Sequence, residues 1–151
     1  EVVDTGKLCS EMVQNSDIAE KAKEHLPPDV WQAIKEYFEE GEQARWKRLT
    51  QCWEAIHKGL AEMGLGTVID KEIQGHLVVT VKAPEDDRFD FFKLHDYCFE
   101  RGFTIYPGKM FGLATFRLCN LGWISPRDIE DFFVVAKEAF QEMGYAFPIT
   151  Q

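Results

Sequence analysis

The sequence has little positive charge and no long apolar run. It holds 17 lysine and arginine residues against 26 acidic residues, which gives a net charge of −9 at pH 7. An acidic chain repels phosphate backbones and anionic lipid headgroups, so we expect neither a nucleic acid nor a membrane surface as its partner. No apolar stretch approaches the ~18 residues that a membrane-spanning helix needs.

Closely spaced cysteines are also absent. The four cysteines are Cys9, Cys52, Cys98 and Cys119, and no CxxC pair occurs. Their wide, irregular spacing predicts reduced and mostly buried thiols, which favours a cytoplasmic protein. The first residues show no basic region followed by a long apolar stretch, so no signal peptide is expected. The missing initiator methionine suits a processed chain or a piece of a longer one.

Self-contained catalytic motifs are missing as well. The sequence has no GxxxxGK[ST], GxGxxG, GxSxG or HExxH pattern. His95 and Cys98, three residues apart on a predicted helix, come nearest to a metal-binding pair, but no second pair accompanies them, so we interpret them as packing residues. Acidic pairs such as Asp86-Asp87 are typical of solvated turns. We therefore predict no catalytic residue and no metal site.

The chain is long enough for one domain, and 45% of its residues are apolar. Its acidity is unevenly placed, because residues 1–43 carry a net charge of −7 and residues 44–151 carry only −2. Pro27-Pro28 is a natural break in the chain. The sequence thus predicts an acidic N-terminal segment of unassigned role over residues 1–28 and a folded domain over residues 29–151.

Two helices are expected at the start of this domain. Asp29 can cap the first, which runs to about Gly41. The second shows the clearest periodicity, because its apolar residues recur at intervals of three and four and predict one stripe packed on a core. Gly64 and Gly66 end it. The residues of the stripe are Trp46, Leu49, Trp53, Ile56, Leu60 and Met63.

The pattern then changes to short strand candidates, among them a β-branched run at His76–Val81, alternating with helices. Strands are expected at Thr67–Ile69, His76–Val81, Phe103–Tyr106 and Thr115–Cys119, and helices at residues 90–101 and after Ser125 up to Gly144. Ser125, Pro126 and Asp128 form a typical helix start. The order β-β-α-β-β-α predicts an α+β fold, a two-layer sandwich with a small mixed or antiparallel sheet and helices on one face.

Arg117 is the candidate functional residue. It lies in the apolar strand Thr115–Cys119, where a buried charge is costly unless it meets an anion. Side chains alternate along a strand, so Arg117 shares a face with Thr115 and Cys119. A guanidinium on a rigid strand can bind a carboxylate through two hydrogen bonds. The alternative is an arginine at the sheet margin, paired with a local acidic residue.

These residues resemble a known family. The stretch RGFTIYPGK, followed after five residues by TFR and then by CNLG, resembles the C-terminal small domain of class V pyridoxal-phosphate-dependent aminotransferases. The likeness is greatest to 2-aminoethylphosphonate–pyruvate transaminases. It covers about residues 29–144 and is most specific at residues 101–122. The resemblance implies the fold of a fold-type I aminotransferase C-terminal domain.

The resemblance also implies roles. The family's arginine for the substrate carboxylate falls on Arg117, while Tyr106 and Lys109 are expected to serve in strand packing and a solvated turn. Two departures, Cys119 in place of a common glycine and the apolar residues 110–114, leave the amino donor open. The family's cofactor, pyridoxal phosphate, is held by a large domain with a Schiff-base lysine. That domain is therefore an expected partner, in the same or another chain, and a homodimer is possible.

Two functions follow from this resemblance. In the first, the chain is the substrate-binding domain of a transaminase that moves an amino group to a 2-oxo acid; alone, it is expected to bind no pyridoxal phosphate and to be inactive. In the second, the chain is a stand-alone interaction or assembly module that inherited the fold without the chemistry. Its interface would then be the aromatic-rich helices or the acidic N-terminal segment.

Overall fold

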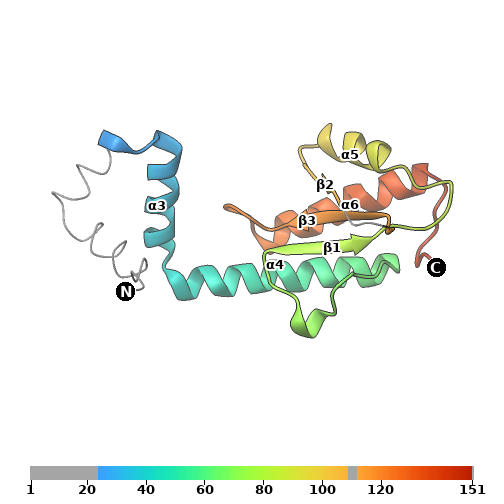
Figure 1. Ribbon diagram of the computed structural model, residues 1–151, viewed down its shortest axis with the longest axis horizontal. Coiled ribbons are helices and arrows are strands. Elements are labelled where there is room, and N and C mark those ends of the chain that lie inside the picture. The colour runs from blue at the N-terminus through green and yellow to red at the C-terminus, as the bar shows by residue number, and fades with distance from the viewer. Residues whose placement is uncertain (1–23, 109–111, 151) are drawn as a thin grey trace. The chain divides into compact units, whose positions relative to one another are not determined.

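The computed structural model describes residues 24–108 and 112–150 (Figure 1). These residues fall into two compact units that divide between Lys47 and Arg48. Most of the acidic segment predicted over residues 1–28 lies outside the described residues, as does Lys109. Within them, no helix is long and apolar enough to cross a membrane.

The first unit contains helix α3, Pro28–Glu40. The prediction that Asp29 caps this helix is wrong. Pro27 occupies the N-cap position without a side-chain hydrogen bond, and Asp29 lies in the first turn. Proline is well suited to a helix start because its fixed φ is close to the helical value and an amide hydrogen there has no helical acceptor. Gly41 ends α3 with a φ of 77°.

Helix α4, Glu42–Met63, confirms the long periodic helix. Most of its predicted stripe packs on a core, since Trp53, Ile56 and Leu60 are at most 6% exposed. Trp46 is the exception, with 58% of its surface exposed. It belongs to the first unit, and the core of the second unit begins only after Arg48. The helix ends at Gly64, whose φ is 75°.

The second unit is an α+β sandwich, as predicted. Its sheet has the order β1-β3-β2 and both pairings are antiparallel. Figure 1 shows helices α4, α5 and α6 running along this sheet. The remaining elements are β1 (Val78–Lys82), β2 (Tyr106–Pro107), β3 (Thr115–Cys119), α5 (Phe91–Phe99), α6 (Pro126–Glu142) and a short 3-10 turn, η1 (Lys71–Ile73).

One face of the sheet forms the core with the helices. Val79 and Val81 of β1 and their cross-strand partners Leu118 and Phe116 of β3 are all buried. They share one hydrophobic cluster with residues of all three helices, among them Ile56, Leu94 and Phe140. The other face, here called the outer face, carries the alternate strand positions: Val78, Thr80, Lys82, Tyr106, Thr115, Arg117 and Cys119.

Two strands differ from expectation. Thr67–Ile69 does not form a strand. Thr67 pairs with Val81 through an isolated antiparallel β-bridge. The strand expected at Phe103–Tyr106 is Tyr106–Pro107. The Phe103 ring instead packs edge-on against Phe132, 5.7 Å between centroids, and Ile105 is buried. These side chains hold the backbone against the core, so the chain pairs with β3 only from Tyr106 onward.

The start of α6 confirms the helix start predicted at Ser125, Pro126 and Asp128. The Ser125 side chain accepts a hydrogen bond from the amide of Asp128, and the Asp128 carboxylate accepts one from the amide of Ser125. This capping box satisfies two backbone donors that a helix end otherwise leaves unpaired. It fixes where the segment after β3 turns back across the sheet.

Candidate functional site

Arg117 occupies the middle of β3 on the outer face of the sheet. It lies opposite Thr80 on β1 and opposite Tyr106 on β2. Side chains directly opposite each other in an antiparallel pair lie on the same face, with Cβ atoms ~4.5–5.5 Å apart. The topology therefore places the guanidinium between two hydroxyl-bearing side chains from other strands, an arrangement that no local sequence pattern indicates.

The surroundings of Arg117 differ from the sequence expectation in one respect, its burial. Its side chain is exposed rather than surrounded by apolar groups. It makes no ion pair or hydrogen bond to an acidic residue in the described part of the chain. The two charged residues on the outer face, Arg117 and Lys82, are both basic. The face is thus locally positive in a protein whose net charge is −9, which suits an anion.

Cys119 lies two positions along β3 from Arg117 and is half-buried. Burial raises the pKa of the Cys119 thiol, while the positive charge of Arg117 acts in the opposite direction. Burial likewise raises the pKa of Cys98, to about 11. Both thiols are therefore neutral near pH 7, and neither is an activated nucleophile. Cys52, Cys98 and Cys119 form no disulfide.

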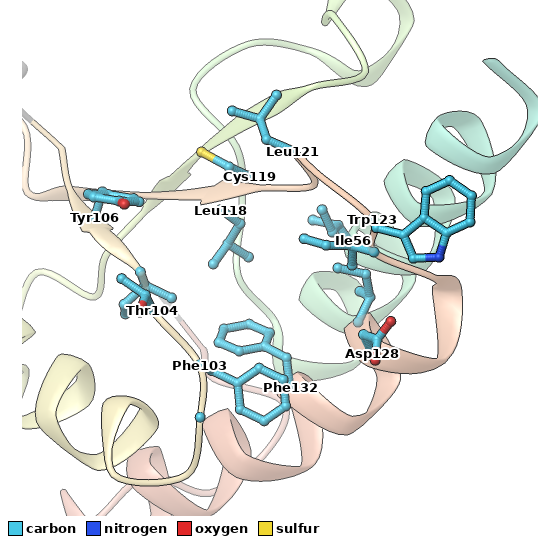
Figure 2. A pocket seen from close by; sticks show the side chains of 14 residues that line it. Ile56, Phe103, Thr104, Tyr106, Leu118, Cys119, Leu121, Trp123, Asp128 and Phe132 are labelled. Carbon is cyan, nitrogen blue, oxygen red and sulfur yellow. The ribbon is translucent and has the colours of Figure 1, made fainter. Parts of the chain in front are cut away.

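A hollow of about 540 Å³ opens beside the end of β3 (Figure 2). Its walls are mostly apolar, and Figure 2 shows Leu118 and Cys119 pointing to opposite sides of the strand. The segment after β3 supplies Leu121 and Trp123, of which 55% and 66% are exposed. Sequence reasoning missed this hollow, although two large apolar residues in a turn were a signal for it.

Arg48 of α4 fixes this segment. Its guanidinium donates hydrogen bonds to the carbonyl oxygens of Gly122 (3.1 Å) and Ile124 (2.8 Å). It also lies 5.3 Å from the centroid of the Trp123 ring, a cation–π distance. The apolar rim of the hollow is therefore held in place by α4.

His95 and Cys98, the pair that the sequence places nearest to a metal-binding pattern, both contact neighbouring side chains. The Cys98 side chain is fully buried in the core. His95 stacks on Phe99, with 5.8 Å between ring centroids, and lies 2.9 Å from an Asp96 oxygen. Residues 24–108 and 112–150 contain no group of three or more histidine, cysteine or acidic side chains that could hold a metal ion.

Tyr106 departs from its expected role. It was expected to pack within a strand, yet 54% of its surface is exposed. It lies at the margin of the sheet because β2 has only two residues and pairs on one side only. The geometry therefore brings Tyr106, Thr80 and Arg117 together on the outer face.

Comparison with known proteins shows the relatives of this chain. No family model matches it. It is 36% identical over 121 residues to a 2-aminoethylphosphonate–pyruvate transaminase from Polaromonas sp., covering 80% of this chain and 32% of the relative. It is 33% identical over 113 residues to the transaminase of the same name from Cupriavidus taiwanensis, covering 74% of this chain and 30% of the relative. The chain thus spans about a third of the length of these relatives.

Solved structures share the fold at lower identity. Ureidoglycine–glyoxylate aminotransferase from Bacillus subtilis matches with a TM-score of 0.69 and 17% identity, over 78% of this chain and 30% of that protein. Pyridoxamine–pyruvate aminotransferase from Mesorhizobium loti matches with a TM-score of 0.67 and 21% identity, over 76% and 30%. The chain is therefore homologous to the C-terminal small domain of class V pyridoxal-phosphate-dependent aminotransferases, the 2-aminoethylphosphonate–pyruvate transaminases among them.

Proposed function

We propose that the second unit is the substrate-binding domain of a transaminase of this class, and that Arg117 binds the carboxylate of the amino or 2-oxo acid. One observation carries the proposal: Arg117 is exposed in the middle of β3 and forms no ion pair with the described acidic residues. Its planar guanidinium can donate two parallel hydrogen bonds to a carboxylate. A charge held on a strand between two others fixes the direction in which the bound acid points.

The described residues do not by themselves fit pyridoxal phosphate, which needs an amine for its aldehyde and donors for its phosphate. The hollow beside β3 is lined by no lysine or arginine. A second hollow, of about 490 Å³, contains Lys82, but Glu85 and Asp86 line it too and repel a phosphate. The proposal therefore requires a separate lysine-bearing domain, in the same or another chain, and the chain alone is inactive.

A stand-alone interaction module is the second candidate. It is favoured by the exposed Leu121 and Trp123 at the rim of the hollow, because exposed apolar residues beside a concavity are typical of protein contacts. Such a module has no need of an unpaired arginine on the sheet. The two functions therefore differ in what they require of Arg117.

The test is a titration of the 15N-labelled chain with pyruvate, followed by NMR. Shifts are expected at Arg117 and its cross-strand neighbours. Charge-assisted hydrogen bonds are worth ~1.5–3 kcal/mol, so Arg117→Gln should weaken binding roughly 10- to 100-fold.

The matched control is Arg127→Gln. Arg127 is exposed on α6, where it pairs with Asp131 at 3.1 Å, and its loss should leave pyruvate binding unchanged. Equal pyruvate affinity in the wild type and in Arg117→Gln would remove Arg117 from the site and leave the interaction module as the better reading.

A further inference from the structure

Residues 71–76, here called the strap, lie in the connection between α4 and β1 (Figure 1). The strap begins with the short turn η1, none of whose residues is buried. Ile73, its one large apolar side chain, is 79% exposed. Burial of apolar surface therefore does not hold the strap on the fold, and its polar side chains must do so.

Three pairs of side chains attach the strap to α4. They are Lys71 with Glu54 (2.5 Å), Gln74 with His57 (2.8 Å) and His76 with Thr50 (3.1 Å). The partners on α4 follow one another at intervals of four and three residues, so they share one face of the helix. The Trp53 ring lies among these pairs, because it stacks on His76 at 4.3 Å and its centroid is 4.9 Å from the Lys71 ammonium.

Two buried donors oppose this closed arrangement. Trp53 and Gln74 are 6% and 7% exposed, and within the described residues neither the indole N–H of Trp53 nor the amide nitrogen of Gln74 has an acceptor. A buried donor without an acceptor costs free energy, which contact with water would recover. The contacts of the strap must outweigh this cost, so the closed state is sensitive to the loss of any one of them.

His57 is the titratable residue on which the strap closes. The Gln74 side-chain oxygen can only accept, so the neutral His57 ring carries its hydrogen on Nε2 and donates it to Gln74. A second proton must go to Nδ1, which makes no hydrogen bond within residues 24–108 and 112–150. Protonation therefore places a positive charge in a half-buried ring, beside a Trp53 ring that already contacts the Lys71 ammonium.

We infer that protonation of His57 releases the strap from α4, so that residues 71–76 act as an acid-sensitive latch on the second unit. The release is local. Val79 and Val81, which follow the strap in β1, are fully buried and keep the sheet on the core. Opening exposes Trp53 and its neighbours on α4 while the sandwich stays folded.

The charges around His57 set the pH range of the release. Burial is the main cause that lowers the pKa of His57, and Lys71 acts in the same direction. The hydrogen bond to Gln74 and the carboxylates of Glu54 on α4 and Glu72 on η1 act in the opposite direction. A histidine whose pKa is lower in the folded state favours the closed strap fully above its unfolded pKa, ~6.5, and this contribution is lost progressively as the pH falls towards the lower folded pKa.

The experiment follows the 15N-labelled 151-residue chain by NMR between about pH 7.5 and about pH 5. The readout is the solvent exchange of the buried Trp53 indole proton, divided by that of Trp123, whose side chain is 66% exposed. This ratio should rise roughly tenfold, with the midpoint at which the His57 ring titrates. Signals from β3 and α6 should stay at their folded positions.

His57→Gln replaces the imidazole by a neutral side chain that can still donate to Gln74, so its strap should stay closed at about pH 5. The matched control is His95→Gln, which removes a histidine from α5 and should keep the response of the wild type. A response that persists in His57→Gln, or one that is lost in His76→Gln but not in His57→Gln, would overturn the assignment to His57. If His57→Gln does not fold, the wild type decides, because different midpoints for Trp53 exchange and His57 titration also rule the latch out.

Discussion

Asp86, which the sequence predicts in a solvated turn, is the centre of a hydrogen-bond network. Its carboxylate accepts hydrogen bonds from the Arg88 side chain and from the Tyr145 hydroxyl, and Arg88 also donates to the carbonyl of Gly144. The side-chain hydrogen bonds from Arg88 and Tyr145 hold the Asp86 pKa well below its usual range. Burial, followed by the bond to Asp86, raises the pKa of Tyr145 to about 12. One carboxylate therefore links the turn after β1 to the end of α6.

This network predicts an acid-dependent loss of stability. A carboxyl group whose pKa is lower in the folded state stabilises the fold fully above its unfolded pKa, ~3.9, and loses this contribution progressively as the pH falls from there towards the lower folded pKa. The free energy of unfolding, measured by urea titration from about pH 7 to pH 2, should therefore drop below about pH 4. Asp86→Asn should be less stable at pH 7 and show a shallower drop.

Asp87→Asn is the control for this prediction, because Asp87 is the exposed neighbour in the same turn. Its pH profile should match that of the wild type. A profile of Asp86→Asn that runs parallel to the wild type would show that the network contributes nothing to acid stability.

Among the elements, α4 and α6 approach each other at Gly59. This glycine is buried within α4, and a Cβ atom built on it would overlap the ring of Phe133 from α6. Periodicity identified the apolar stripe of α4 but gave no reason for a glycine in the middle of it. The reason is tertiary: the Phe133 ring fills the space that any other side chain at residue 59 would occupy.

Gly59→Ala should therefore destabilise the protein, although alanine is intrinsically the better helix former by ~1 kcal/mol. Overpacking a well-packed core costs ~1–3 kcal/mol, which exceeds the gain in helix propensity. Urea unfolding measures the difference. Gln51→Ala, at an exposed position of the same helix, should change stability by less than ~0.5 kcal/mol. A more stable Gly59→Ala protein would mean that the two helices can move apart freely.

For the whole molecule, the proposed function places the anion site in this chain and the cradle for pyridoxal phosphate in another domain. Arg117 lies on the outer face of the sheet, and the large hollow beside β3 contains no lysine. Seven of the eleven lysines lie in the described residues. The proposed function assigns the cofactor to another domain, so the chain should offer no specific lysine to it.

The 151-residue chain mixed with an equimolar amount of pyridoxal phosphate should therefore show no saturable aldimine absorbance band. Weak adducts with surface amines would survive the replacement of any one lysine. A saturable band that disappears in a single Lys→Ala variant would contradict the assignment and show that the chain holds the cofactor itself.

Local order was largely determined by the sequence. The period of α4, the capping box at Ser125 and the β-branched run of β1 each reflect interactions between residues close along the chain. Short-range backbone preferences and side-chain periodicity are enough to specify such elements. The motif around Arg117 likewise indicated the family.

Only the tertiary structure decided what surrounds that residue. The exposure of Arg117, its position between Tyr106 and Thr80, and the retreat of Phe103 and Ile105 into the core all depend on strand register and helix packing. Register couples residues that are 11 and 37 positions from Arg117 along the chain. A strand pattern records which residues alternate, and the partner strand alone determines which side chains face one another.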